Sequence, residues 1–140
     1  MDESTIREKL SRIKCFMLDM DGTFYLGANL LDGSLDFMEK LRETGRTNLF
    51  LTNNSSKSAE VYRQKLARMG LDVPEEHFYT SALATAAFLA DQAPGCSVYA
   101  LGEAGLLNAL YDRGITSEFA PMSFAPFQTR FVAFVSVSSE

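Results

Sequence analysis

Two aspartates, Asp19 and Asp21, lie two positions apart in the segment LDMDGT, directly after an apolar run. Gly22 follows them and lets the backbone turn sharply beside a ligand. Such a pair suits phosphoryl transfer, in which one carboxylate attacks phosphorus while the other protonates the leaving oxygen and later activates water. Because the two carboxylates repel each other and an anionic substrate, we expect a hard divalent cation such as Mg²⁺ to neutralise them.

The segment DMDG could instead be an ordinary turn, because Asp and Gly are common turn residues. At average amino-acid usage, these four residues are expected by chance in roughly one chain in a thousand of this length. The requirement for an apolar strand immediately before them makes a chance match rarer still. We therefore favour a catalytic role for Asp19 and Asp21 over a purely structural turn.

A second polar turn, LTNNSS at residues 51–56, ends another apolar run. The Thr52 hydroxyl and the backbone N–H groups of the turn are suitable donors for phosphoryl oxygens. The next helix begins just beyond, and its N-terminal dipole also favours an anion. Taken alone, the Asn and Ser residues would more simply cap that helix. Beside an acidic turn at the same edge of a parallel sheet, they favour a phosphate site.

The elements that position these turns alternate between strands and helices, which predicts an α/β fold with a doubly wound parallel sheet. The first half is expected to contain a helix at 6–13, a strand covered on both faces at 15–20, a glycine-punctuated loop, a helix at 34–44, a strand at 47–54 and a helix at 58–69. The predicted apolar stripes of the last two helices are Leu35, Met38 and Leu41 with Phe37 beside them, and Val61, Tyr62, Leu66 and Met69. Gly45 and Gly70 are the expected helix stops.

After Pro74 the chain becomes richer in alanine. A helix is predicted at 81–92 with Ser81 as its N-cap, then a strand at 97–101 and a helix at 105–114. The segment 118–128 is predicted to be irregular and 130–137 to be a strand. The phenylalanines of this end are expected to pack in a core or an interface: Phe119, Phe124, Phe127, Phe131 and Phe134.

Composition excludes several classes of protein. The 18 acidic and 13 basic side chains give a net charge of −5, which argues against a nucleic-acid partner. No apolar run approaches the roughly 20 residues of a membrane helix, and the N-terminal segment lacks the apolar core of a signal peptide. Cys15 and Cys96 are predicted to be buried, reduced thiols of a cytoplasmic protein. His77 is predicted to be a solvated surface residue.

The segments LDMDGT, LTNNSS and TSALATAAFL together resemble the haloacid dehalogenase (HAD) superfamily of phosphatases. The closer resemblance is to its NagD-type and p-nitrophenylphosphatase-like subgroup, and it covers about residues 14–115. It implies a HAD-like Rossmannoid parallel sheet whose N-terminal part is residues 1–80. Residues 81–140 would be the beginning of an inserted α/β cap domain. The implied substrate is a small phosphorylated metabolite, and the full-length protein is a possible homodimer.

The resemblance also implies a role for each acidic residue. Asp19 would be the nucleophile that becomes aspartyl-phosphate, and it would also be a Mg²⁺ ligand. Asp21 would be the general acid and base, and its backbone carbonyl would bind the metal.

The implied substrate-binding residues are Gly22, Thr52, Asn53 and Asn54. Thr52 would hold the phosphoryl group through its hydroxyl, with help from the Asn53 backbone amide. Gly22 would permit the tight turn under the phosphate and place its own amide near a phosphoryl oxygen. Asn54 would orient the substrate or the cap loop.

The sequence departs from the family pattern towards its C-terminal end. The family needs a later lysine and later acidic residues, but the last lysine here is Lys65 and the only aspartates beyond Asp72 are Asp91 and Asp112. We therefore expect a chain cut off within the cap, marginally folded and with negligible phosphatase activity alone. Two alternatives stay open: a non-catalytic remnant or phosphate-binding interaction module, and a fragment that another chain completes.

Overall fold

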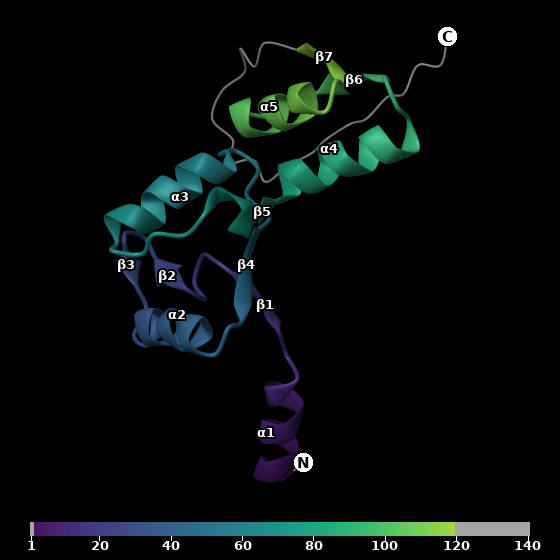
Figure 1. Cartoon of the computed structure of the whole chain (residues 1–140). Coiled ribbons are helices and arrows are strands. Elements are labelled where there is room, and N and C mark those ends of the chain that lie inside the picture. Colours follow the sequence, from purple (N-terminus) through teal and green to yellow (C-terminus); the bar gives the residue numbers. More distant parts are fainter. Residues whose placement is uncertain (1, 120–140) are drawn as a thin grey trace. The chain divides into compact units, whose positions relative to one another are not determined.

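A computed structural model describes residues 2–119 (Figure 1). These residues form two compact units. The first unit contains the residues up to Thr52 together with Arg63–Phe78. The second unit contains Asn53–Tyr62 and the chain from Tyr79 onward. Within the described residues, no helix combines the length and apolarity needed to cross a membrane.

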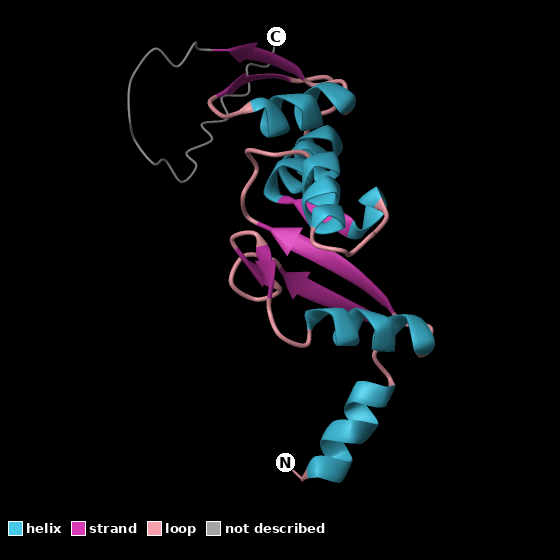
Figure 2. Cartoon of the chain, turned by 90° about the vertical axis from the view of Figure 1, so that its left-hand side faces the viewer, coloured by secondary structure: helices cyan, strands magenta, loops and turns pink. Residues whose placement is uncertain are grey.

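The main sheet has three strands in the order β1 (Cys15–Asp19), β4 (Thr47–Thr52) and β5 (Phe78–Thr80). Strands β1 and β4 are parallel, and Cys15 pairs with Thr47 at one end of the ladder. Figure 2 shows these strands as magenta arrows. The predicted α/β class with a parallel sheet is confirmed.

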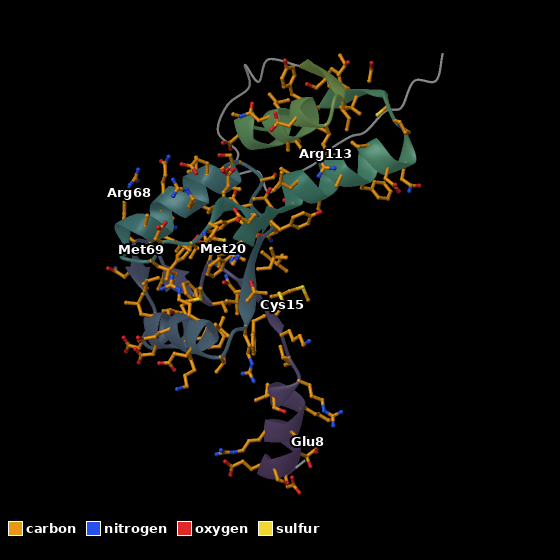
Figure 3. All side chains as sticks on the ribbon, viewed as in Figure 1. Glu8, Cys15, Met20, Arg68, Met69 and Arg113 are labelled. Atoms are coloured by element: carbon orange, nitrogen blue, oxygen red, sulfur yellow. The ribbon has the colours of Figure 1, made fainter. Side chains whose placement is uncertain are left out.

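Strand β1 differs from the prediction because only one of its faces is covered. Every second residue of the strand, starting at Cys15, is exposed on the other face, and Met17 is 73% exposed. Cys15, labelled in Figure 3, shares that face and is an exposed free thiol. Cys96 is half-buried. The prediction of two buried thiols is therefore wrong. The apolar run had suggested cover on both faces, but the alternating burial along β1 shows that only one face is covered in the described residues.

The covered face of β1 packs on α2 (Ser34–Glu43), where the rings of Phe16 and Phe37 meet edge to face at 5.5 Å. Met38 and Leu41 are buried as predicted, but Leu35 is 48% exposed. Ser34 is buried in its place and donates a hydrogen bond of 2.8 Å from its hydroxyl to the Phe24 carbonyl.

Other elements of the first unit differ from prediction in their bounds. Helix α1 spans Glu3–Ser11 rather than 6–13, because Asp2 accepts a hydrogen bond from the Thr5 amide and begins the helix early. The predicted loop contains a short hairpin, β2 (Tyr25–Leu26) and β3 (Asn29–Leu30). The centre of this unit holds the rings of Phe24, Phe50 and Phe78, with centroid separations of 4.8 and 5.4 Å.

Helix α3 spans Ala59–Arg68 and buries Tyr62 and Leu66, as the stripe predicts, but leaves Val61 42% exposed. A 3-10 helix, η1 (Glu75–His77), precedes β5. His77 is half-buried, with Nδ1 lying 3.2 Å from Oδ1 of the buried Asn48. The prediction of a solvated His77 is therefore wrong.

The second unit contains α4 (Ser81–Gln92), β6 (Ser97–Ala100), α5 (Ala104–Asp112) and β7 (Thr116–Phe119). Strands β6 and β7 are parallel. Its core is formed by small and aliphatic side chains: Ala82, Ala86, Leu89, Val98, Ala100, Leu106, Ala109, Leu110 and Ile115. Strand β7 includes two residues of the segment predicted to be irregular, and the predicted strand at 130–137 lies outside the described residues, as do Phe124, Phe127, Phe131 and Phe134.

Candidate active site

Asp19 and Thr52 end neighbouring parallel strands. Asp19 is the last residue of β1 and pairs with Leu51, so Thr52 lies one position further along β4 at the same edge. The Asp19 side chain is exposed, whereas Thr52 is 8% exposed. Carboxyl ends of parallel strands are where open α/β sheets bind ligands. The arrangement thus brings a carboxylate and a hydroxyl to the ligand-binding edge of the first unit.

The backbone after Asp19 turns tightly around the buried Met20. Its carbonyl accepts hydrogen bonds from the amides of Phe24 at 3.0 Å and Tyr25 at 3.3 Å. Gly22 has a φ of +82°, a conformation that favours glycine because other residues carry a Cβ. Its amide donates a hydrogen bond of 2.8 Å to the Tyr25 carbonyl. In this turn the Gly22 amide therefore has a protein partner.

The two carboxylates have different neighbours. Asp19 accepts a hydrogen bond of 3.1 Å on Oδ2 from the Thr23 hydroxyl. Asp21 has an exposed carboxylate whose Oδ1 lies 3.9 Å from Nζ of Lys65, on α3. Each carboxylate thus has its own hydrogen-bond donor or cation within the first unit.

The second turn is held by hydrogen bonds within the second unit. Oδ1 of Asn54 accepts from the amide of Ser56 at 3.0 Å and from its hydroxyl at 2.7 Å. The Asn54 carbonyl accepts from the Tyr62 hydroxyl at 3.1 Å, and the Asn53 carbonyl from the Ser81 hydroxyl at 2.9 Å. The Asn54 side chain therefore shapes the turn itself.

Ser81 does not cap α4 as the sequence suggested. Thr80 is the N-cap, and its hydroxyl accepts a hydrogen bond of 3.2 Å from the Leu83 amide. Because the helix begins at Ser81, the Ser81 hydroxyl is available to donate to the Asn53 carbonyl instead. This correction links the start of α4 to the second turn.

Helix α5 also approaches this turn closely, at Gly105. A Cβ placed on Gly105 would overlap the Ser55 carbonyl oxygen and lie 2.9 Å from the Lys57 amide nitrogen. Only glycine allows the helix to pack this near to the backbone of the turn.

The sequence motifs point to Asp19, Asp21 and Thr52 but not to three side chains that contact the candidate site residues. Thr23 stands inside LDMDGT and could have been found from its spacing to Asp19. Lys65 and Ser81 carry no local signal, because each reaches its partner from a different element of the chain.

The donors at the sheet edge suit a hard metal ion. Carboxylate and carbonyl oxygens are the ligands that Mg²⁺ prefers, and Mg²⁺ usually keeps several waters beside one or two carboxylates. Within residues 2–119, no group of three or more His, Cys, Asp and Glu side chains is arranged to hold a metal. The exposed pair Asp19 and Asp21 fits a Mg²⁺ site in which these two residues supply part of the ligand sphere.

A parallel α/β protein with an acidic pair at the end of its first long strand is typical of one class of hydrolase. Residues 16–116 match the haloacid dehalogenase-like hydrolase family, and the chain belongs to that family. It is 42% identical over 106 residues to an acid sugar phosphatase of Staphylococcus aureus. The matched region covers 76% of this chain and 41% of that relative.

Solved structures agree with this assignment. A 4-nitrophenylphosphatase from Thermotoga maritima is 42% identical and has a TM-score of 0.74, covering 76% of this chain and 41% of that one. A glycerol phosphate phosphatase from Mycobacterium tuberculosis, in complex with magnesium, is 32% identical with a TM-score of 0.70, covering 76% and 32%. The resemblance to the superfamily and to its NagD-type and p-nitrophenylphosphatase-like subgroup is confirmed. The chain spans about 41% of the length of the curated relatives it matches.

Proposed function

We propose that the protein carrying this chain is a Mg²⁺-dependent phosphatase that hydrolyses small phosphomonoesters through an aspartyl-phosphate intermediate. The observation that carries the proposal is the position of Asp19 at the end of β1, in register with Leu51 and one position short of Thr52 on β4. The names of the relatives support it, because acid sugar phosphatase, 4-nitrophenylphosphatase and glycerol phosphate phosphatase all denote enzymes acting on phosphate esters.

The proposed chemistry has two steps. An oxygen of Asp19 attacks phosphorus, the bond to the leaving oxygen breaks, and Asp21 gives that oxygen a proton. Asp21 then takes a proton from a water molecule that attacks the phosphorus of the aspartyl-phosphate, which releases inorganic phosphate and regenerates Asp19. The Thr23 hydroxyl bonds Oδ2 of Asp19 and so orients the carboxylate with Oδ1 as the attacking oxygen.

The substrate-binding roles follow from the same edge of the sheet. Thr52 and the Asn53 amide would hold non-bridging phosphoryl oxygens, and Gly22 would keep the turn narrow enough for the phosphate to approach. Asn54 would act indirectly, because its side chain organises the second turn by accepting from Ser56.

Asp19, through its carboxylate, and Asp21, through its backbone carbonyl, would hold Mg²⁺. When bound, the ion offsets the negative charge of carboxylate and phosphate. A relative crystallised with magnesium supports this assignment.

For the 140-residue chain by itself we propose negligible activity. The sequence contains no lysine beyond Lys65, and its described residues supply only part of a Mg²⁺ sphere. A missing donor to the developing charge costs roughly a hundredfold or more in rate.

We further propose that residues 1–80 are the N-terminal part of the HAD core and 81–140 the beginning of the cap. The free thiols at Cys15 and Cys96 support a reducing, cytoplasmic setting. The proposed partner is a small phosphorylated metabolite, and a homodimer of the full-length protein through its cap is a further expectation.

A phosphate-release screen on the full-length protein tests the function. Wild type with Mg²⁺ should hydrolyse p-nitrophenyl phosphate and small phosphate esters, and a chelator should abolish turnover. Asp19→Asn should be inactive, whereas Asp36→Asn, an exposed change on α2, should keep wild-type kcat. Full activity in Asp19→Asn would overturn the proposal. Phosphate binding by wild type without any turnover would favour the alternative, a phosphate-binding module.

A further inference from the structure

Lys65 brings a positive charge to the acidic turn from a separate helix. Its Nζ lies 3.9 Å from Oδ1 of Asp21, and both residues belong to the first unit. The side chain of Lys65 is 28% exposed and that of Asp21 is 59% exposed. In this pair the Lys65 side chain is largely buried, whereas the Asp21 side chain is exposed to solvent.

The ammonium of Lys65 also lies over an aromatic ring. Nζ is 3.7 Å from the centroid of Tyr25, a side chain with 0% exposure. A cation at this distance from a ring face is attracted by the ring quadrupole, more strongly where water is excluded. The contact with this fully buried ring thus restricts the Lys65 side chain, which would otherwise be flexible.

Tyr25 is itself tied to the backbone of the acidic turn. Asp21 and Tyr25 form an isolated β-bridge, and the Gly22 amide donates to the Tyr25 carbonyl at 2.8 Å. Because the backbone of Asp21 and the ring that holds Lys65 belong to one hydrogen-bonded turn, the ammonium is held near the backbone of Asp21.

An exposed ion pair between two flexible side chains usually contributes little, because ordering them costs entropy and salt screens the charges. Here the covered stem and the ring have already restricted the cation. The remaining freedom is that of the Asp21 carboxylate, which the nearby charge can orient. Lys65 also offsets the repulsion expected between Asp19 and Asp21, which are two positions apart in the sequence.

We propose that Lys65 is a positioning residue, which holds the Asp21 carboxylate in the orientation for proton transfer and compensates the charge of the acidic pair. This inference rests on the proposed function, because it assigns Asp21 to proton transfer. It places a cation of the site on α3, within the N-terminal part of the chain.

Steady-state kinetics of the full-length protein with p-nitrophenyl phosphate test the inference. Lys65→Gln should lower kcat roughly five- to tenfold and change KM less than about twofold, because it acts on proton transfer rather than on substrate binding. Lys65→Arg should retain about half of kcat or more, since a guanidinium can stack on Tyr25 and still reach the carboxylate. Lys40→Gln, which removes a charge paired with Glu43 on the surface of α2, should match wild type.

A double-mutant cycle on the unfolding equilibrium checks the contact without turnover. Lys65→Gln should change the unfolding constant roughly two- to fivefold more in the wild-type background than in Asp21→Asn, where only the contact with the Tyr25 ring is lost. Additive effects would overturn the inference, as would an unchanged kcat in Lys65→Gln or equal losses in Lys65→Gln and Lys65→Arg. An inactive Asp19→Asn with a fully active Lys65→Gln overturns this inference alone. A fully active Asp19→Asn overturns the proposed function and this inference with it.

Discussion

The Thr23 hydroxyl donates a hydrogen bond of 3.1 Å to Oδ2 of Asp19, the carboxylate at the end of β1. The bond joins the strand end to the tight turn that follows, where the Thr23 amide also faces the Met20 carbonyl at 3.4 Å. The hydroxyl donates to a charged acceptor, and such hydrogen bonds are stronger than those between neutral groups. The orientation of Asp19 thus depends on a side chain from the same motif.

Removal of this hydroxyl is expected to slow catalysis. Thr23→Val keeps the shape of the side chain but removes the donor, so kcat of the full-length protein should fall roughly tenfold. Thr23→Ser keeps a hydroxyl at the same position and should stay within about threefold of wild type. Equal kcat values for Thr23→Val and wild type would show that the bond does not orient Asp19 for the proposed attack.

Two neighbouring residues at the start of α4 should have separable effects. Thr80→Ala removes the N-cap and should lower the free energy of unfolding by about 1 kcal/mol, whereas Thr80→Ser should lower it much less. Ser81→Ala leaves the cap intact and removes only the bond to the Asn53 carbonyl. We expect a loss of about 0.5–1.5 kcal/mol from Ser81→Ala, measured by urea unfolding. A larger loss at Ser81 than at Thr80, with the helix shortened, would mean that Ser81 is the cap after all.

Substitution of Gly105 should be poorly tolerated. The added methyl group of Gly105→Ala would overlap the backbone of the second turn at Ser55 and Lys57, which has little room to move. Overpacking of this kind costs about 1–3 kcal/mol, so we expect a lower Tm by calorimetry. Gly102→Ala is the control, because its Cβ would meet side-chain atoms of Leu106 alone, the nearest being Cδ2 at 2.9 Å, and no backbone. Similar Tm values for the two variants would contradict the close approach of α5.

Helix α1 should lose stability in acid through Asp2. The hydrogen bond from the Thr5 amide, with that from the Ser4 hydroxyl, lowers the pKa of Asp2 from 3.8 to about 2. Because the folded pKa lies below the unfolded value, the stabilisation is present above about pH 4 and is lost as the pH falls towards 2. Amide chemical shifts of residues 3–11 between pH 5 and 1.5 measure this loss.

Asp2→Asn provides the control for that titration, since an amide oxygen can still cap the helix but does not ionise in this range. The variant should show a smaller step in helicity between pH 4 and 2 than wild type, because only the Glu3–Arg7 and Glu8–Arg12 pairs of the helix then respond to acid. Asp2→Ala should have a frayed first turn at every pH. A step of wild-type size in Asp2→Asn would assign the transition to another group.

Local patterns were sufficient for the order of helices α1 to α5 and of strands β1, β4 and β6, but not for the hairpin of β2 and β3, for β5 or for β7. Thr47–Thr52 alternates in burial, and α2 ends at Glu43, two residues before the predicted stop at Gly45, which has a φ of +63°. The LDMDGT and LTNNSS turns follow strands that pair in parallel, which brings Asp19 and Thr52 to one edge. These features depend on residues that are close in sequence, so periodicity and turn chemistry are able to predict them.

The tertiary structure decided which side chains have neighbours. The apolar run at residues 15–20 predicted a strand buried on both faces. In the structure Met17 is exposed and Phe16 packs against Phe37, because burial depends on which elements pack on each face. The approach of Lys65 to Asp21 and Tyr25, and of Ser81 to Asn53, joins segments distant along the chain. No local sequence pattern predicts such contacts, since they form only when helices and strands pack together. The sequence by itself therefore determined the candidate site residues and the two strands that carry them, and packing determined the charges and hydrogen bonds that surround them.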